Sequence, residues 1–387
     1  MRRWAAALAL LALLGCTTAA LLAPLPVAAA LLAVGATAAR HRRAILVLGG
    51  ASLAANLLLF GLFGPGTVTT IGWIPVHGAG IALAGATALR LTAVAAVNLG
   101  GLARVPMERL LDGLRLPPRV AGTLAAVALC ARDVGRDAAR LVDAAKLDGA
   151  WPARRLAQAR TVAALLPALL VASVRRAETR REALRLAGQD LAPAWTPIVA
   201  VGALTLAGRF ALLAVPNVSV TYAVVFLGGV LFGARVGALA GLLGMLLSDL
   251  VLTGLQPTPL VNGPAMALLG LLGGALRGLD WGSRRPAQAG ANRALAAAVG
   301  VAATLLFSVA ADALTWAIVP EYRAQPGSLR ILVAAGLLFN VLPAVANALL
   351  FGAATAPTVR AWRAVRGLTP GASPPRPPAT AGPQPAP

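Results

Sequence analysis

The chain has 387 residues, of which 58% are hydrophobic and 12% charged, and its formal net charge is +21. Apolar stretches of about 20 residues recur along it, which excludes a soluble globular protein and indicates an all-α, polytopic protein of the cytoplasmic (inner) membrane. The arginines lie between the apolar stretches and not on a face that also carries aromatic residues, so the charge does not indicate nucleic-acid binding.

The N-terminus has two interpretations. A basic start followed by an apolar run that ends at Cys16 is typical of a lipoprotein signal. The apolar sequence resumes at Ala19 and continues to about residue 39, so we interpret it as membrane-spanning. Cys16 and Cys130 are too far apart in the sequence for a disulfide framework or a metal site.

About four membrane spans are expected before residue 104, because long apolar segments alternate with basic turns. The segments cover residues 5–21, 24–39, 44–62 and 78–100. The first two are short and are separated by Pro24 and Pro26, so residues 5–39 form either a tight hairpin or one kinked element.

Residues 104–190 differ from the segments around them. Charged residues recur every three or four positions among Leu and Ala, as on an amphipathic helix, and Pro118 and Pro152 stand where a helix can begin. The apolar run 161–174 is short and has basic residues on both sides. We therefore expect a cytoplasmic domain that contains this run as a buried helix.

The same short pattern, acid-Ala-x-base-Leu-x-Gly, occurs at residues 143–149 and 182–188. It predicts two similar helix ends that are presented to a partner. The bases and glycines of the two copies are Lys146, Gly149, Arg185 and Gly188.

A second apolar region predicts six spans with both ends in the cytoplasm, because arginines concentrate on one side. The spans are expected at residues 197–215, 217–233, 236–255, 261–279, 293–319 and 330–355. We expect residues 361–387, which are rich in proline, to form a disordered tail.

Polar residues inside these spans are the candidate ligand site, because intramembrane polar groups are costly and often functional. They share a similar depth near the outer face: Asn217, Thr221, Tyr222, Asp249, Asn262, Asp312 and Trp316. Two alternatives remain: Asp249 and Asp312 are solvated at helix ends, or they are the acid and base of a membrane-embedded enzyme. Asn340 and Asn347 are predicted to form interhelical hydrogen bonds.

Two further features bear on partners. The chain has no Walker-type phosphate loop and no histidine with an acidic partner at a metal-ligand spacing, so we expect no cofactor or metal and an energy source on another polypeptide. The spacing of Ala203, Ala207 and Ala211 allows another helix to approach closely.

Two segments resemble subunits of energy-coupling factor (ECF) transporters, the vitamin and metal importers of prokaryotes. Residues 78–190 resemble the transmembrane T component, through residues 78–102, 105–116, 117–119 and the two repeats. Residues 197–355 look like the substrate-binding S component, through residues 209–217, 228–233, 237–241, 248–249 and 262–264 and the glycines at 270, 273 and 274.

The resemblance implies a fusion of a T-like scaffold (1–190) with a six-helix S-like module (191–360). Its expected partners are a micronutrient, either cobalamin-like or another vitamin, and separate ABC-type ATPase subunits that bind ATP and Mg²⁺. It also implies that Ala203, Ala207 and Ala211 form the surface between the S-like and T-like parts.

The repeats depart from the T family, in which each ends Ala-Arg-Gly and the arginine docks into an ATPase. Here the endings are Leu-Asp-Gly and Leu-Ala-Gly. Lys146 and Arg185 stand two residues before the family's arginine, which is about 200° around a helix. A scaffold that has lost its coupling is therefore a further alternative.

Overall fold

The structure is a computed structural model. It describes a few isolated positions before residue 58 and residues 25–38, 68–71, 74–102, 118–149, 155–186, 192–211, 220–252, 259–318, 320–324 and 327–367. In these ranges the protein is helical apart from one antiparallel hairpin, so the all-α prediction is confirmed. The hairpin pairs β1 (Val68–Ile71) with β2 (Ile74–His77).

Two N-terminal helices pack along each other. They are α2 (Leu25–Ala38) and α4 (Gly78–Leu102), close to two of the predicted segments. Ala28 on α2 and Ala93 and Val94 on α4 form their small buried core. The predicted segments 5–21 and 44–62 lie outside the described residues, apart from isolated positions.

The charged region forms two long helices, α6 (Pro118–Leu147) and α7 (Arg155–Leu186). Pro118 begins α6 as expected, because the first helical position needs no backbone N–H donor. The apolar run of α7 is buried through Leu166, Leu170 and Val174, as predicted, where α7 packs on α8 and α15.

The following helices form the central bundle. They are α8 (Thr196–Ala211), preceded by the short η2 (Pro193–Trp195), then α9 (Val220–Phe232), α10 (Ala234–Leu252), α11 (Pro259–Ala275), η3 (Leu276–Gly278) and α12 (Pro286–Ile318). Glycines let α9, α10 and α11 approach closely: a Cβ atom added at Gly229 or Gly237 would collide with the carbonyl oxygen of Gly270. The glycine-rich motifs of this region are therefore helix contacts.

The prediction of one helix over 330–355 is wrong. The structure has the short α13 (Pro320–Arg323), then α14 (Ser328–Phe339) and α15 (Val341–Val365), which meet at Asn340. The Asn340 side chain donates to the carbonyl oxygen of Gly336 at 2.7 Å, and Pro343 falls in the first turn of α15, where its missing N–H costs least. These two residues end one helix and start the next within a continuous apolar run.

The interhelical hydrogen bonds predicted for the two asparagines are present. Asn340 donates to the Ser308 hydroxyl and Asn347 to the Thr304 hydroxyl, both at 2.8 Å. They join the last two helices to α12.

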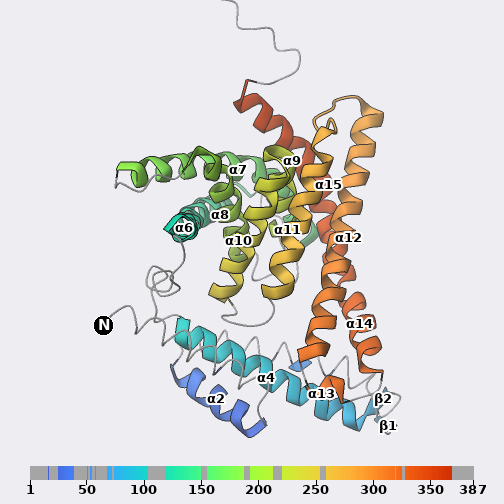
Figure 1. The fold of residues 1–387 in the computed structure, drawn as a ribbon. Helices are drawn as coiled ribbons and strands as arrows, with labels where there is room; N and C mark the ends of the chain where they lie inside the picture. The colour runs from blue at the N-terminus through green and yellow to red at the C-terminus, as the bar shows by residue number, and fades with distance from the viewer. Residues whose placement is uncertain are drawn as a thin grey trace, which may run out of the picture.

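Figure 1 shows how these parts are arranged. Helices α8–α11 run side by side next to α12 and α15, α6 and α7 pack at one side, and α2 and α4 cross the opposite end of the drawing. Within the described ranges, Pro286–Ile318 is the one helix with both the length and the apolar composition to cross a membrane, and α8 and α9 are apolar but shorter. A polytopic membrane protein is consistent with this arrangement, and the number of spans stays a prediction.

Candidate functional site

An apolar groove lies between α11 and α12. Its volume is about 490 Å³. It is lined by Tyr222, Ala265, Met266, Leu268, Leu269, Leu272, Ala298, Val299, Ala302, Ala303, Leu306, Phe307 and Ala310. Tyr222 is the one lining residue with a hydroxyl group, and the rest of the wall is hydrocarbon or sulfur. Such a groove suits the flat, apolar part of a small ligand.

Aromatic contacts position the tyrosine at this groove. Tyr222 from α9 meets Phe307 from α12 edge to face, with ring centroids 5.5 Å apart. Met266 from α11 is buried beside them. The groove therefore offers ring edges and a polarisable sulfur, which favour stacking with an aromatic ligand.

Asp249 and Asn262, both predicted site residues, meet at the ends of α10 and α11. Asp249 is fully buried; Arg209 of α8 donates to its Oδ1 atom, and Asn262 donates to Oδ2 at 2.8 Å. Both carboxylate oxygens thus have donors from the protein itself, as a buried charge requires. This cluster joins three helices, and Arg209 is its most exposed member, with 23% of its side chain exposed.

The sequence did not point to Arg209 as the partner of Asp249. The two residues are 40 positions apart, and no helical spacing links them. The only sequence signal for this pair is that a cation lies near the end of one apolar segment and an anion lies near the end of another, at the same expected depth.

Asp312 and Trp316 lie elsewhere, on the side of α12 that faces α14. Asp312 fits against Gly336, where an added Cβ atom would collide with its carboxylate. Its Oδ2 atom is buried without a hydrogen-bond partner among the described residues. Trp316 packs against a small cluster that contains Tyr322 and Leu332.

The seven predicted ligand residues are thus distributed over several places. Thr221 is buried and donates to the carbonyl oxygen of Thr205 at 3.2 Å, and Asn217 lies outside the described residues. Asp249 and Asp312 contact different helices and have different neighbours. That arrangement gives no support to an acid and base pair.

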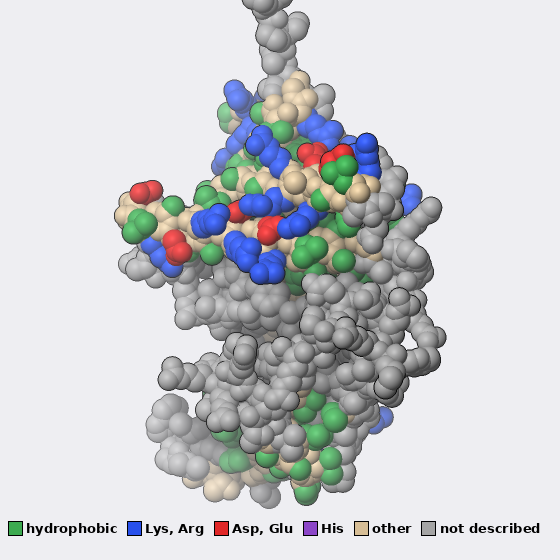
Figure 2. Space-filling model, turned by 90° about the vertical axis from the view of Figure 1, so that its left-hand side faces the viewer, with side chains coloured by type: hydrophobic (Ala, Val, Ile, Leu, Met, Phe, Trp, Pro, Cys, Tyr) green, Lys and Arg blue, Asp and Glu red, His purple; other side chains and the backbone are tan. Residues whose placement is uncertain are grey.

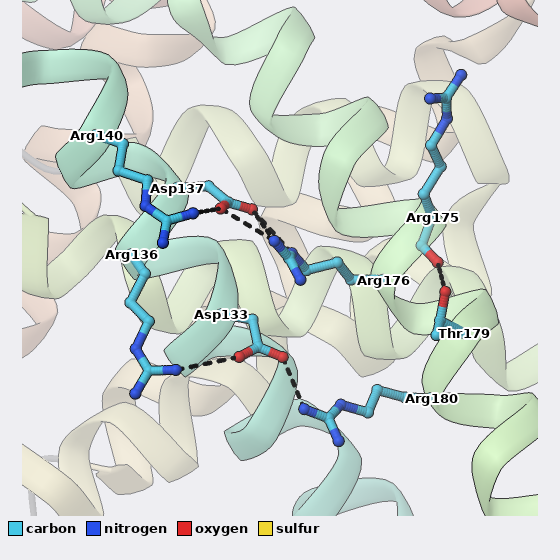
Figure 3. Close-up of polar contacts among 8 residues, drawn as sticks. All are labelled: Asp133, Arg136, Asp137, Arg140, Arg175, Arg176, Thr179 and Arg180. Carbon is cyan, nitrogen blue, oxygen red and sulfur yellow. Dashed lines mark hydrogen bonds and ion pairs between the residues drawn. The ribbon is translucent and has the colours of Figure 1, made fainter. Parts of the chain in front are cut away.

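The second candidate site is the pair α6 and α7, whose outer surface carries many basic side chains with a few acidic ones among them (Figure 2). Ion pairs join the two helices (Figure 3): Asp133 accepts from Arg180 at 2.9 Å, and Asp137 accepts from Arg176. The hydrogen bond from Arg180 is the main reason that the pKa of Asp133 is lowered.

The two repeats form matching helix ends. Lys146 pairs with Asp143 at 3.3 Å, and Arg185 pairs with Glu182 at 3.9 Å, so the acid and the base of each repeat neutralise each other on the helix surface. Leu147 and Leu186, next in the pattern, are 88% and 80% exposed. The repeat pattern alone does not show that these leucines are exposed.

The end of α6 also shows why its repeat closes with glycine. Gly149 has φ of 68°, the left-handed conformation that glycine adopts without strain, and its N–H donates to the carbonyl oxygen of Lys146 at 3.1 Å. Gly188 lies outside the described residues.

The alanine stripe lies in α8, which packs against α6, α7, α9 and α10. Ala203 and Ala207 are buried, and the side chain of Ala211 lies outside the described residues. Ala200 falls on the same helical face as the stripe, and its carbonyl oxygen accepts from Ser173 of α7 at 2.6 Å.

Comparison with known proteins finds a similarity over the central bundle. Residues 197–356 match the family described as ECF-type riboflavin transporter, S component. The match supports an ECF S component from the start of α8 to within α15, which is less than half of the chain. That family is a transport component of membranes. No curated protein and no solved structure gives a significant match.

Proposed function

We propose that this chain is the membrane subunit of an ATP-driven ECF-type vitamin importer, with a T-like scaffold in residues 1–190 and the S component in residues 191–360. The family match over 197–356 is the observation that carries the proposal. The scaffold half rests on its resemblance to T components and on the packing of α6 and α7 against α8 and α15.

The apolar groove between α11 and α12 is the proposed substrate site. Its aromatic residues, Tyr222 and Phe307, suit a flat ring system, and riboflavin, the vitamin in the name of the matched family, has one. A volume of about 490 Å³ lies in the usual range for small-ligand sites. We therefore favour a flavin-like vitamin over a cobalamin-like one, whose macrocycle is much larger.

In this proposal Asp249 has a structural role. Its carboxylate is enclosed by Arg209 and Asn262, so it fixes the ends of α8, α10 and α11. Of the three helices, α11 lines the groove, and α8 and α10 pack against α9, which carries Tyr222. The ion pair keeps them in register.

The α6–α7 pair is the proposed link to separate ATPase subunits, which would bind ATP and Mg²⁺. The helices are long, joined by ion pairs, and packed on the substrate-binding bundle, and both expose a leucine at their C-terminal end. An exposed leucine gains free energy when it is buried in an apolar pocket of a partner, which offers a docking contact where the T family uses arginine.

Riboflavin binding to the full chain in lipid nanodiscs tests the substrate assignment, with flavin fluorescence as the readout. Filling the groove by Ala303→Trp should weaken binding at least tenfold. Ala313→Trp is the matched control, because Ala313 is exposed on the same helix and does not line the groove. Equal affinity in both variants would reject the groove as the site, and no binding to the unmodified chain would reject a flavin as the substrate.

A further inference from the structure

A second cavity lies at the opposite end of the bundle, where α9 and α15 end and α8 begins. Its volume is about 350 Å³. It is lined by Pro197, Val230, Leu231, Phe232, Arg277, Leu279, Trp281, Val359, Trp362, Arg363 and Arg366. The proposed vitamin site and the α6–α7 contacts do not use it.

The cavity has a cationic wall that its own carboxylate does not neutralise. Arg363 donates to Asp280 at 2.8 Å, and the guanidinium of Arg366 lies 4.8 Å from the centre of the Trp362 ring. Among the described residues, neither Arg277 nor Arg366 forms an ion pair. Two guanidinium groups with free hydrogen-bonding capacity therefore line one cavity, and their planar donors match a phosphate group.

The surrounding sequence strengthens this positive field. Residues 276–300 and 350–367 contain seven arginines and a single acidic residue, Asp280. An excess of arginine marks the cytoplasmic side of a membrane protein, and tryptophans concentrate at the level of the lipid headgroups. Trp362 packs edge to face on Phe232, with ring centroids 4.9 Å apart, at this arginine-rich end of the bundle.

The opposite wall is apolar. Val230, Leu231 and Val359 line the cavity beside the arginines. A free phosphate ion would leave this hydrocarbon surface unused, whereas the glycerol and first acyl carbons of a lipid would cover it.

We propose that this cavity binds the phosphate headgroup of an anionic phospholipid from the cytoplasmic leaflet. Arg277 and Arg366 contact the phosphate, Trp362 holds Arg366 in place, and the apolar wall takes the upper part of the lipid. The inference rests on the membrane location of the module and not on its vitamin or on its ATPases. Because the lining residues come from α8, α9, the η3 turn and the end of α15, a bound lipid ties these elements together.

Native mass spectrometry of the full chain in detergent can test this with phosphatidylglycerol and phosphatidylcholine as probes. The unmodified chain should bind phosphatidylglycerol at least tenfold more tightly. The double variant Arg277→Gln/Arg366→Gln should lose that preference. Arg284→Gln/Arg285→Gln is the matched control: both residues are exposed at the same end, neither lines the cavity, and the loss of charge is the same.

The outcomes separate a built site from general attraction. Retained preference in the control and loss in the cavity variant support the proposal, provided that both variants elute as the same folded species on gel filtration. Equal losses in the two variants would assign the binding to diffuse surface charge and overturn it. Displacement of the lipid by inorganic phosphate at equal concentration would overturn the lipid assignment in favour of a soluble anion. If the cavity variant fails to fold, Arg366→Lys, which keeps the charge but not the planar donors, should still weaken phosphatidylglycerol binding severalfold, and unchanged binding there contradicts the proposal.

Discussion

Asp137 of α6 and Arg176 of α7 share two hydrogen bonds, from Nε to Oδ2 at 2.8 Å and from Nη2 to Oδ1 at 3.0 Å. One helical turn back along α6 and one turn further along α7, Asp133 and Arg180 form the next pair at 2.9 Å. The two pairs, one turn apart on each helix, fix the register of α6 and α7 where the helices cross. The register decides where the helix ends at Leu147 and Leu186 lie relative to each other.

The inter-helix pairs should weaken in acid. Because the pKa of Asp133 is lowered in the folded protein, its contribution to stability is present above the unfolded value of about 4 and is lost as pH falls through the lower folded value. We expect the distribution of distances between spin labels at positions 144 and 183 to stay narrow from pH 8 to pH 5 and to broaden below about pH 4. Asp133→Asn should broaden this distribution at pH 7 as well. The substitution should lower the free energy of unfolding by about 1 kcal/mol or less, because the pair is partly exposed.

A matched control for that experiment is Asp143→Asn. Asp143 pairs only with the nearby Lys146 on the same exposed surface, so its loss should not change the label distance. A narrow distance distribution for Asp133→Asn at pH 7 would show that packing, and not the ion pairs, holds the two helices together.

The glycine contacts between α9, α10 and α11 should tolerate no side chain. A methyl group at Gly229 would collide with the backbone of Gly270 and Gly274, so Gly229→Ala should destabilise the bundle by about 1–3 kcal/mol. Gly290→Ala in α12 meets no atom within 4 Å and should leave the thermal midpoint unchanged or slightly higher. Equal midpoints for the two variants in nanodiscs would contradict the close packing.

Sequence reasoning located most helices because long apolar and amphipathic segments carry a periodic signal. It missed the break at Asn340, because the apolar composition continues across it and the signal there is only an asparagine followed by Pro343. The groove was also missed, since Ala, Leu and Met in a span look alike whether they face lipid, a ligand or another helix. The acid and base of each repeat were visible, but that they pair with each other needed the side-chain geometry.

The predicted ligand residues show the same limit. Depth in the membrane could be estimated from the spans, but not the direction in which each side chain points around its helix. Asp249 and Asp312 were therefore grouped by depth, whereas the structure gives them separate partners on separate helices.

A double-mutant cycle should separate a structural from a ligand role for Asp249. Asp249→Ala leaves the Arg209 cation without its carboxylate, so we expect a loss of about 3 kcal/mol in stability. Arg209→Ala/Asp249→Ala removes both charges and should recover part of that loss. Thermal unfolding of the single and double variants without ligand measures the coupling. If the two substitutions instead leave stability nearly unchanged while Asp249→Ala abolishes riboflavin binding, Asp249 belongs to the substrate site.

The exposed leucines at the ends of α6 and α7 should control attachment of the ATPases. Leu147→Ser/Leu186→Ser removes two side chains that are 88% and 80% exposed. The substitutions should therefore change the stability of the fold little, but they should weaken a contact in which a partner buries these leucines. We expect the variant to bind riboflavin normally, to lose at least tenfold in co-purification with its ATPase subunits, and to stop vitamin uptake. Val365→Ser is the control, because Val365 is 54% exposed at the end of another helix, α15.

Since α6 and α7 pack on α8 and α15, docking at their tips could move the binding bundle only while the Asp137–Arg176 and Asp133–Arg180 pairs hold the register. If the leucine variant co-purifies with as much ATPase as the unmodified chain does, these helix ends do not dock the ATPases, and the chain is a binding scaffold without coupling there.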